Sequence, residues 1–110
     1  MRVKPDKVLQ LVGMAQRAHG VASGEFMTET TVKSGKAYMV VIAEDASENT
    51  KKQFQNMCEF YRVPVRIYGT KDSLGHAIGK EMRASLSVTN EGLANEIMSK
   101  IDGGSKEWQK

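Results

Sequence analysis

Apolar and polar positions along the chain divide it into helical stretches separated by short apolar runs. Apolar residues recur at the spacing of one helix face in the ranges 6–19, 45–61, 72–80 and 91–101. The range 25–34 is also expected to be a helix, although its threonines and valine lower helix propensity. A short apolar run at 20–22 leads into that helix, and further strands are predicted at 37–43, 63–67 and 84–88.

The run from Tyr38 to Ala43 is apolar without interruption, which predicts a central strand covered by helices on both faces. Pro64 places the following strand near an edge of the sheet. Helices alternating with strands predict an α/β fold, a three-layer α/β/α sandwich with a small sheet. The chain is expected to form one domain over 1–102. Asp102 and the glycines after it should end the last helix and leave a loose tail over 103–110.

Helix starts carry recognisable capping residues. Ser23 is the expected N-cap of the helix at 25–34, followed by Gly24 and by Glu25 in the first turn. Asp45 with Glu48 predicts the next helix start, by the capping-box spacing. Thr70 is expected to cap the range 72–80, and the pair at 89–90 is expected to cap the last helix.

Composition is that of a globular domain, with 40% hydrophobic and 26% charged residues. The 16 basic residues exceed the 13 acidic ones only slightly, which permits a polyanionic partner without requiring one. No secretory signal or membrane-length apolar run is present, so we expect a cytoplasmic protein. The single cysteine, Cys58, falls on the apolar stripe of its helix, where an inert thiol is expected.

Catalytic and metal chemistry are weakly supported. His19 and His76 have no carboxylate at ligand spacing, so neither a metal nor another cofactor is expected. Glu44 and Asp45 form the one carboxylate pair in a suggestive place, at the end of the central strand. Helix capping by Asp45 explains the pair more simply than catalysis does, because no nucleophile or base partner is visible.

The junction at Gly24 is a candidate phosphate site. A helix N-terminus presents unpaired amides, and a residue without Cβ lets another backbone approach. An ordinary capped helix start explains the same residues. Scattered cations could share one rim with this junction, and single solvated side chains are the alternative. These cations are Arg17, Lys33, Lys36, Lys71, Lys80 and Arg83.

Several segments in order resemble the ribosomal protein L7Ae/L30e family, and within it the small bacterial YlxQ-type branch. The similarity covers about residues 5–101, nearly the whole domain. The segments are 11–18 (LVGMAQRA), 23–25 (SGE), 34–37 (SGKA), 41–52 (VIAEDASENTKK), 63–65 (VPV), 74–80 (LGHAIGK) and 88–92 (VTNEG). The resemblance implies an α/β/α sandwich with a mixed four-stranded sheet and binding of RNA, often at kink-turns.

The resemblance also implies where RNA would bind. In this family the turn that opens the second helix enters the RNA internal loop, and a loop before the last strand contacts an extruded nucleotide. The corresponding positions here are Ser23, Gly24 and Glu25, and then Arg83, Ala84 and Ser85. Lys33, Lys36 and Lys71 are the expected phosphate contacts. The partner would be a ribosomal, other non-coding or messenger RNA element, with the ribosome as a candidate assembly. Neither DNA nor a membrane is expected.

One departure from the family pattern keeps the mode of recognition open. Kink-turn binders of this family typically follow the glycine with Thr-Asn-Glu and place Lys three positions later. Those positions hold Glu25, Phe26, Met27 and Thr30 here, so the usual groups for base edges are missing. Phe26 or Met27 could stack on an unpaired base or could pack in the core. The alternative function is a protein-interaction module of the same fold that has lost kink-turn affinity.

Overall fold

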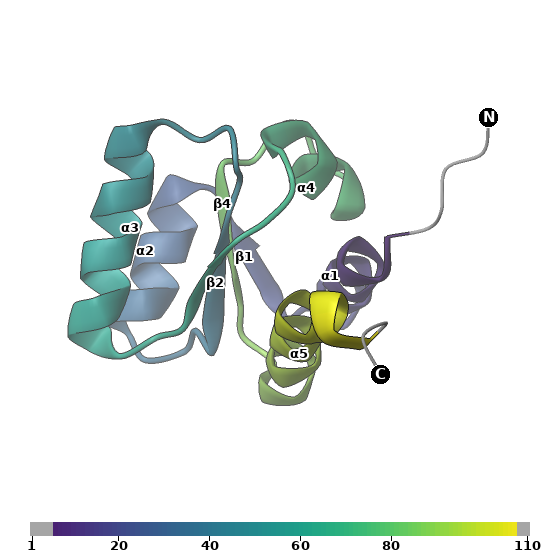
Figure 1. The fold of residues 1–110 in the computed structure, drawn as a ribbon. Coiled ribbons are helices and arrows are strands. Elements are labelled where there is room, and N and C mark those ends of the chain that lie inside the picture. The colour runs from purple at the N-terminus through teal and green to yellow at the C-terminus, as the bar shows by residue number, and fades with distance from the viewer. Residues whose placement is uncertain (1–5, 108–110) are drawn as a thin grey trace.

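Four short strands form one mixed sheet at the centre of the computed structural model, which describes residues 6–107, with side chains from 6 to 103 (Figure 1). The strands are β1 (Val21–Ser23), β2 (Met39–Ile42), β3 (Val65–Ile67) and β4 (Ser85–Val88), in the order β1-β4-β2-β3. β2 and β3 run parallel, whereas β4 is antiparallel to both β1 and β2. The predicted mixed four-stranded sheet is therefore confirmed.

Five helices cover the two faces of this sheet (Figure 1). They are α1 (Lys7–Arg17), α2 (Glu25–Lys33), α3 (Glu48–Tyr61), α4 (Lys71–Ala77) and α5 (Glu91–Glu107). α2 and α3 lie together on one face, and α1, α4 and α5 lie on the other. The three-layer sandwich is confirmed, and it arises because the central strand β2 buries apolar side chains on both of its faces.

The two central strands supply the core. All residues of β2 and β4 are buried, and β2 consists only of apolar side chains, as its uninterrupted run predicts. β4 differs because Ser85 and Ser87 alternate with Leu86 and Val88. The register pairs Val41 with Leu86, and both are fully buried. The serines face the layer formed by α2 and α3, where threonines meet them.

Contacts between those serines and α2 explain why a segment with poor helix propensity is helical. Thr28 and Thr31 are buried on α2. The hydroxyls of Thr31 and Ser87 lie 2.7 Å apart, and Ser85 donates to the Thr28 hydroxyl at 3.5 Å. Small polar side chains let the helix approach the sheet closely while each buried hydroxyl keeps a partner. Tertiary contact thus outweighs the propensity that β-branched residues lose.

Replacing Thr31 by Val should lower the free energy of unfolding by about 1–2 kcal/mol, because the buried Ser87 hydroxyl loses its 2.7 Å partner. Urea denaturation measures the effect. Thr30→Val is the matched control on the exposed face of the same helix, and it should change stability by less than about 0.5 kcal/mol. Equal effects at the two positions would contradict the role given to the Thr31–Ser87 contact.

The last helix is longer than its sequence predicts. α5 continues to Glu107, so the expected end at residue 101 is wrong, and the part of the expected tail at 108–110 lies outside the described residues. Glycine lowers helix propensity by about 1 kcal/mol without forbidding helical dihedrals. The side chain of Asp102 is also held by the sheet, which ties this turn of α5 in place.

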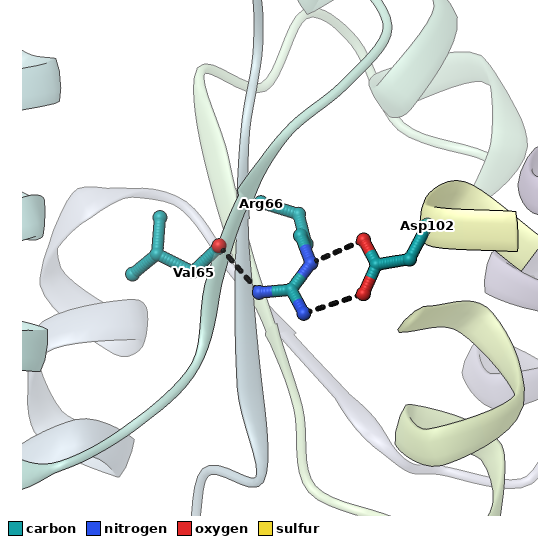
Figure 2. A network of polar contacts seen from close by, with 3 residues as sticks. All are labelled: Val65, Arg66 and Asp102. Atoms are coloured by element: carbon teal, nitrogen blue, oxygen red, sulfur yellow. Dashed lines mark hydrogen bonds and ion pairs between the residues drawn. The ribbon is translucent and has the colours of Figure 1, made fainter. Parts of the chain in front are cut away.

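Arg66 makes that tie across the molecule (Figure 2). Its Nε and Nη2 donate to the two carboxylate oxygens of Asp102 at 2.8 and 2.7 Å. Its Nη1 donates to the Val65 carbonyl at 2.9 Å. The hydrogen bond with Asp102 raises the pKa of Arg66 above its ordinary value. β3 is an edge strand, as Pro64 predicts, and this network occupies a backbone carbonyl there.

Candidate nucleic-acid interface

The candidate interface is the end of the molecule where α2, α3 and α4 begin (Figure 1). Since β4 is antiparallel to both β1 and β2, and β3 is parallel to β2, the strands β1, β2 and β3 all point the same way. A helix follows each of these strands directly in the chain, so the three helices start at one end. Helix N-termini carry partial positive charge, and this arrangement places three of them at the same end of the sheet.

Gly24 joins β1 to α2 and shapes the tip of that end. Its φ of 90° and ψ of 162° lie in a region that is essentially restricted to glycine. Its amide donates to the Ser85 carbonyl at 3.0 Å, which fixes the junction to β4. Gly24 is partly buried, and a Cβ there would meet nothing within 4 Å, so the space in that direction is open.

The first turn of α2 keeps backbone donors available. The first intrahelical bond runs from the Thr28 amide to the Gly24 carbonyl, so the amides of Glu25, Phe26 and Met27 precede it. Gly24 is the N-cap and makes no side-chain capping bond. The expectation that Ser23 caps this helix is therefore wrong, because Ser23 ends β1 and its hydroxyl is used elsewhere.

Arg83 uses that hydroxyl and links three segments. Its Nε donates to Ser23 Oγ at 3.2 Å, and its Nη1 donates to the Met82 carbonyl at 2.9 Å. Its own amide donates to the Lys71 carbonyl at 3.0 Å, at the start of α4. The structure thus brings Arg83 to the Ser23–Gly24 junction, and the backbone of Lys71 is joined to that loop through the Arg83 amide.

The remaining residues of that loop support the site from beneath. Ser85 is 1% exposed, and its hydroxyl bonds to Thr28, so its side chain does not line the surface. Ala84 is partly buried, and its carbonyl accepts from the Ala43 amide at 2.9 Å. Both positions hold the junction and the loop together through their backbones.

Asp45 lies at the same end but has another role than predicted. Its Oδ1 accepts from the Lys71 amide at 2.8 Å, so it secures the first turn of α4. Ser47 caps α3 instead, accepting from the Thr50 amide at 3.1 Å. The expected Asp45 cap is wrong because the tertiary contact with Lys71 engages that carboxylate.

Lys33 and Lys36 lie away from this end. Lys33 is the last residue of α2, whose nine residues place it about 14 Å from the Gly24 tip. It forms an ion pair with Glu29 at 2.7 Å, and the hydrogen bond in that pair raises the pKa of Lys33. Both lysines were expected beside the candidate site, and the structure separates them from it.

Exposed apolar side chains lie near the tip. The sequence left the role of Phe26 and Met27 open and did not indicate Met82. Phe26 is 76% exposed and Met27 is 45% exposed, so neither packs in the core. Met82, next to Arg83, is 57% exposed. In the sequence, only the position of Met82 in a loop before a buried strand could have indicated that its side chain is exposed. Together with the amides and Arg83, these side chains offer both polar and stacking contacts.

Other candidate chemistries find no support among the described residues. No three His, Cys, Asp or Glu side chains in the described part of the chain cluster as metal ligands would. Cys58 is buried, and desolvation raises the pKa of its thiol to about 11, which keeps it protonated at neutral pH. Within residues 6–107, no helix has the length and apolar character needed to cross a membrane.

Comparison with known proteins points in one direction. The family described as "Ribosomal protein L7Ae/L30e/S12e/Gadd45 family" matches residues 6–98. A Bacillus subtilis relative named "RNA-binding protein YlxQ" is 39% identical over 92 residues, covering 84% of this chain and 92% of its own. An Enterococcus faecium protein of the same name is 33% identical over 97 residues, covering 88% and 93%.

Solved structures agree in fold. A Bacillus halodurans protein described as of unknown function superposes with a TM-score of 0.86 at 34% identity, covering 89% of this chain and 99% of its own. A Giardia lamblia protein described as a 15.5kD RNA binding protein has a TM-score of 0.75 at 24% identity, covering 94% of each chain. The second likeness supports the fold alone.

Proposed function

The chain belongs to the ribosomal protein L7Ae/L30e/S12e/Gadd45 family, and from this membership we propose that it is a non-catalytic protein that binds structured RNA. The contact surface is the end where α2, α3 and α4 begin. The observation that carries the proposal is the Gly24 junction, where the first-turn amides of α2 precede the first intrahelical bond and where Arg83 donates to the neighbouring Ser23 hydroxyl. The names of the two YlxQ relatives, which describe RNA-binding proteins, support the same ligand class.

Recognition would depend on RNA shape rather than on base edges. Backbone amides and the guanidinium of Arg83 can contact phosphates, which carry no sequence information. Phe26, Met27 and Met82 present exposed apolar surface where an unpaired base could stack. A distorted internal loop such as a kink-turn offers both features. Ribosomal, other non-coding and messenger RNA elements with such a loop are the candidate ligands.

Substitution of the cations tests this placement. Arg83→Gln should weaken binding of an internal-loop hairpin RNA about tenfold and reduce the salt dependence of the affinity, because one phosphate contact is lost. Lys71→Gln should act in the same direction without disturbing Ser23. Fluorescence anisotropy at two salt concentrations, with a hairpin that lacks single-stranded ends, measures both.

Lys33→Gln is the control for charge alone, because it removes one positive charge about 14 Å away along α2. We expect less than about a twofold change, since exposed charges beyond a Debye length are largely screened. A loss as large as that of Arg83→Gln would place the hairpin at the other end of the layer and contradict the proposed surface.

Three exposed apolar side chains near Gly24 favour a second candidate function, that of a protein-interaction module. In that case Phe26, Met27 and Met82 would contact a partner protein rather than a base. Affinity capture before and after nuclease treatment separates the two functions. A partner that stays bound without RNA and is lost in Phe26→Ser would support the module and count against RNA binding at this end.

A further inference from the structure

A second group of aromatic and basic side chains lies at the opposite end of the layer formed by α2 and α3. Both helices begin at the Gly24 end and finish here (Figure 1). α2 and α3 pack against each other, so the two helix ends are neighbours. We call this group the aromatic–basic surface. Its members lie at the ends of α2 and α3 or in the connection from α2 to β2, which chain order places at this end: Lys33, Lys36, Tyr38, Phe60, Tyr61 and Arg62.

The aromatic rings of this surface are strongly exposed. Phe60 is 78% exposed, and Tyr38 and Tyr61 are 43% and 40% exposed. The rings of Phe60 and Tyr61 meet edge to face, with centroids 4.9 Å apart. Aromatic residues make up only 6% of the chain, so their gathering at one exposed end is not explained by the core. Exposed rings with cations nearby are the usual platform for unpaired bases.

Arg62 adds a positive charge directly after Phe60 and Tyr61 in the chain. It ends α3 in the left-handed conformation, with φ of 62°, at a position where glycine is the usual residue. A non-glycine residue costs conformational energy there, and His19 after α1 has the same conformation, with φ of 60°. A cation at a helix C-terminus also balances the helix dipole, but that role does not require an exposed phenylalanine two residues earlier.

We propose that the aromatic–basic surface binds unpaired nucleotides of RNA, as a contact separate from the Gly24 end. Phe60 and Tyr61 would stack on bases, and Lys36 and Arg62 would contact the flanking phosphates. A structured RNA at one end of α2 could then continue as a single strand to the other end, about 14 Å away. The inference rests on the proposed function only in taking RNA as the ligand.

Two probes separate the two surfaces. The first is a single-stranded oligonucleotide of about 10 nucleotides, within the site sizes of single-strand binders. The second is the hairpin without single-stranded ends. Phe60→Ala should weaken oligonucleotide binding about tenfold and leave hairpin affinity unchanged. Gly24→Asp should weaken hairpin binding and leave oligonucleotide binding unchanged.

Arg62→Gly is a variant in which loss of binding can be separated from loss of folding. Glycine suits the left-handed conformation, so the melting temperature should stay the same or rise, while oligonucleotide affinity falls several-fold. Met14→Ala removes another exposed apolar side chain, from α1 in the other helix layer, and should not affect either probe.

The outcomes are distinct. Absence of oligonucleotide binding by the wild-type protein, or equal binding by wild type and Phe60→Ala, overturns the inference even if the hairpin binds. If the wild-type protein binds the oligonucleotide but not the hairpin, the function proposed for the Gly24 end is overturned and the inference stands. If Phe60→Ala changes only self-association, seen by analytical ultracentrifugation, the surface is a protein interface and the inference fails.

Discussion

Replacing Gly24 by Asp should reduce the affinity for an internal-loop hairpin RNA about 100-fold, equivalent to about 3 kcal/mol. The new carboxylate would lie at the open tip, beside the first-turn amides that are proposed to receive phosphate. Like charges brought together in an interface repel, and the side chain would also fill space that an RNA backbone needs. Titration by fluorescence anisotropy measures the loss.

Backbone strain must be separated from this effect. Gly24 has dihedral angles that suit only glycine, so Gly24→Ala carries the strain without the charge. We expect Gly24→Ala to lower stability by about 1–3 kcal/mol and to retain more RNA affinity than Gly24→Asp. Equal affinities of the two variants would mean that strain at the tip, rather than charge, accounts for the loss.

Gly35→Asp is the matched charge control at the other end of α2. It also has a positive φ, 80°, and a Cβ there would also meet nothing within 4 Å. Hairpin affinity should change by less than about threefold, because the carboxylate is remote from the tip and screened. A loss similar to that of Gly24→Asp would contradict the proposed docking end.

Replacing Gly75 by Ala should destabilise the protein by about 3 kcal/mol, because the added methyl group has no room. A Cβ on this buried residue of α4 would overlap the carbonyl of Glu81, and the Lys80 carbonyl is only 3.1 Å away. The loop over 78–83 folds back across Gly75 and then presents Met82 and Arg83. Thermal unfolding should show a decrease of about 10–20 °C in melting temperature.

Gly103→Ala is the control for this substitution. Gly103 lies in α5, and a Cβ there would meet nothing within 4 Å. Alanine is the better helix former, so stability should rise by up to about 1 kcal/mol. Stability of Gly75→Ala close to that of the wild type would show that the 78–83 loop is not packed as described.

Local patterns in the sequence predicted several features correctly. The apolar run ending in Ala43 is long enough to indicate a buried strand by itself. The Thr70 cap is formed, since its hydroxyl accepts from the Ser73 amide at 3.0 Å. Asn90 likewise caps α5, accepting from the Leu93 amide at 2.9 Å. The run is contiguous and each cap joins residues three positions apart, so no knowledge of the fold is needed.

The candidate site depended on contacts that sequence spacing does not contain. Asp45 and Ser47 are both acceptable caps by local pattern, and the amide of Lys71, 26 positions away, decides between them. Ser23 meets Arg83 only because β1 pairs with β4. The sequence alone allowed Phe26 and Met27 to be core residues. Only the structure shows which side of α2 faces the sheet and that both side chains are exposed.

By itself, therefore, the sequence determined the order of helices and strands, the central strands and the glycine at the head of α2. Each of these follows from hydrophobic periodicity or from dihedral angles that only glycine adopts. The tertiary structure alone decided which cations join Gly24 and which gather with Phe60 at the far end of the same helices. That outcome depends on strand order and direction, which arise from pairing between residues distant in the chain.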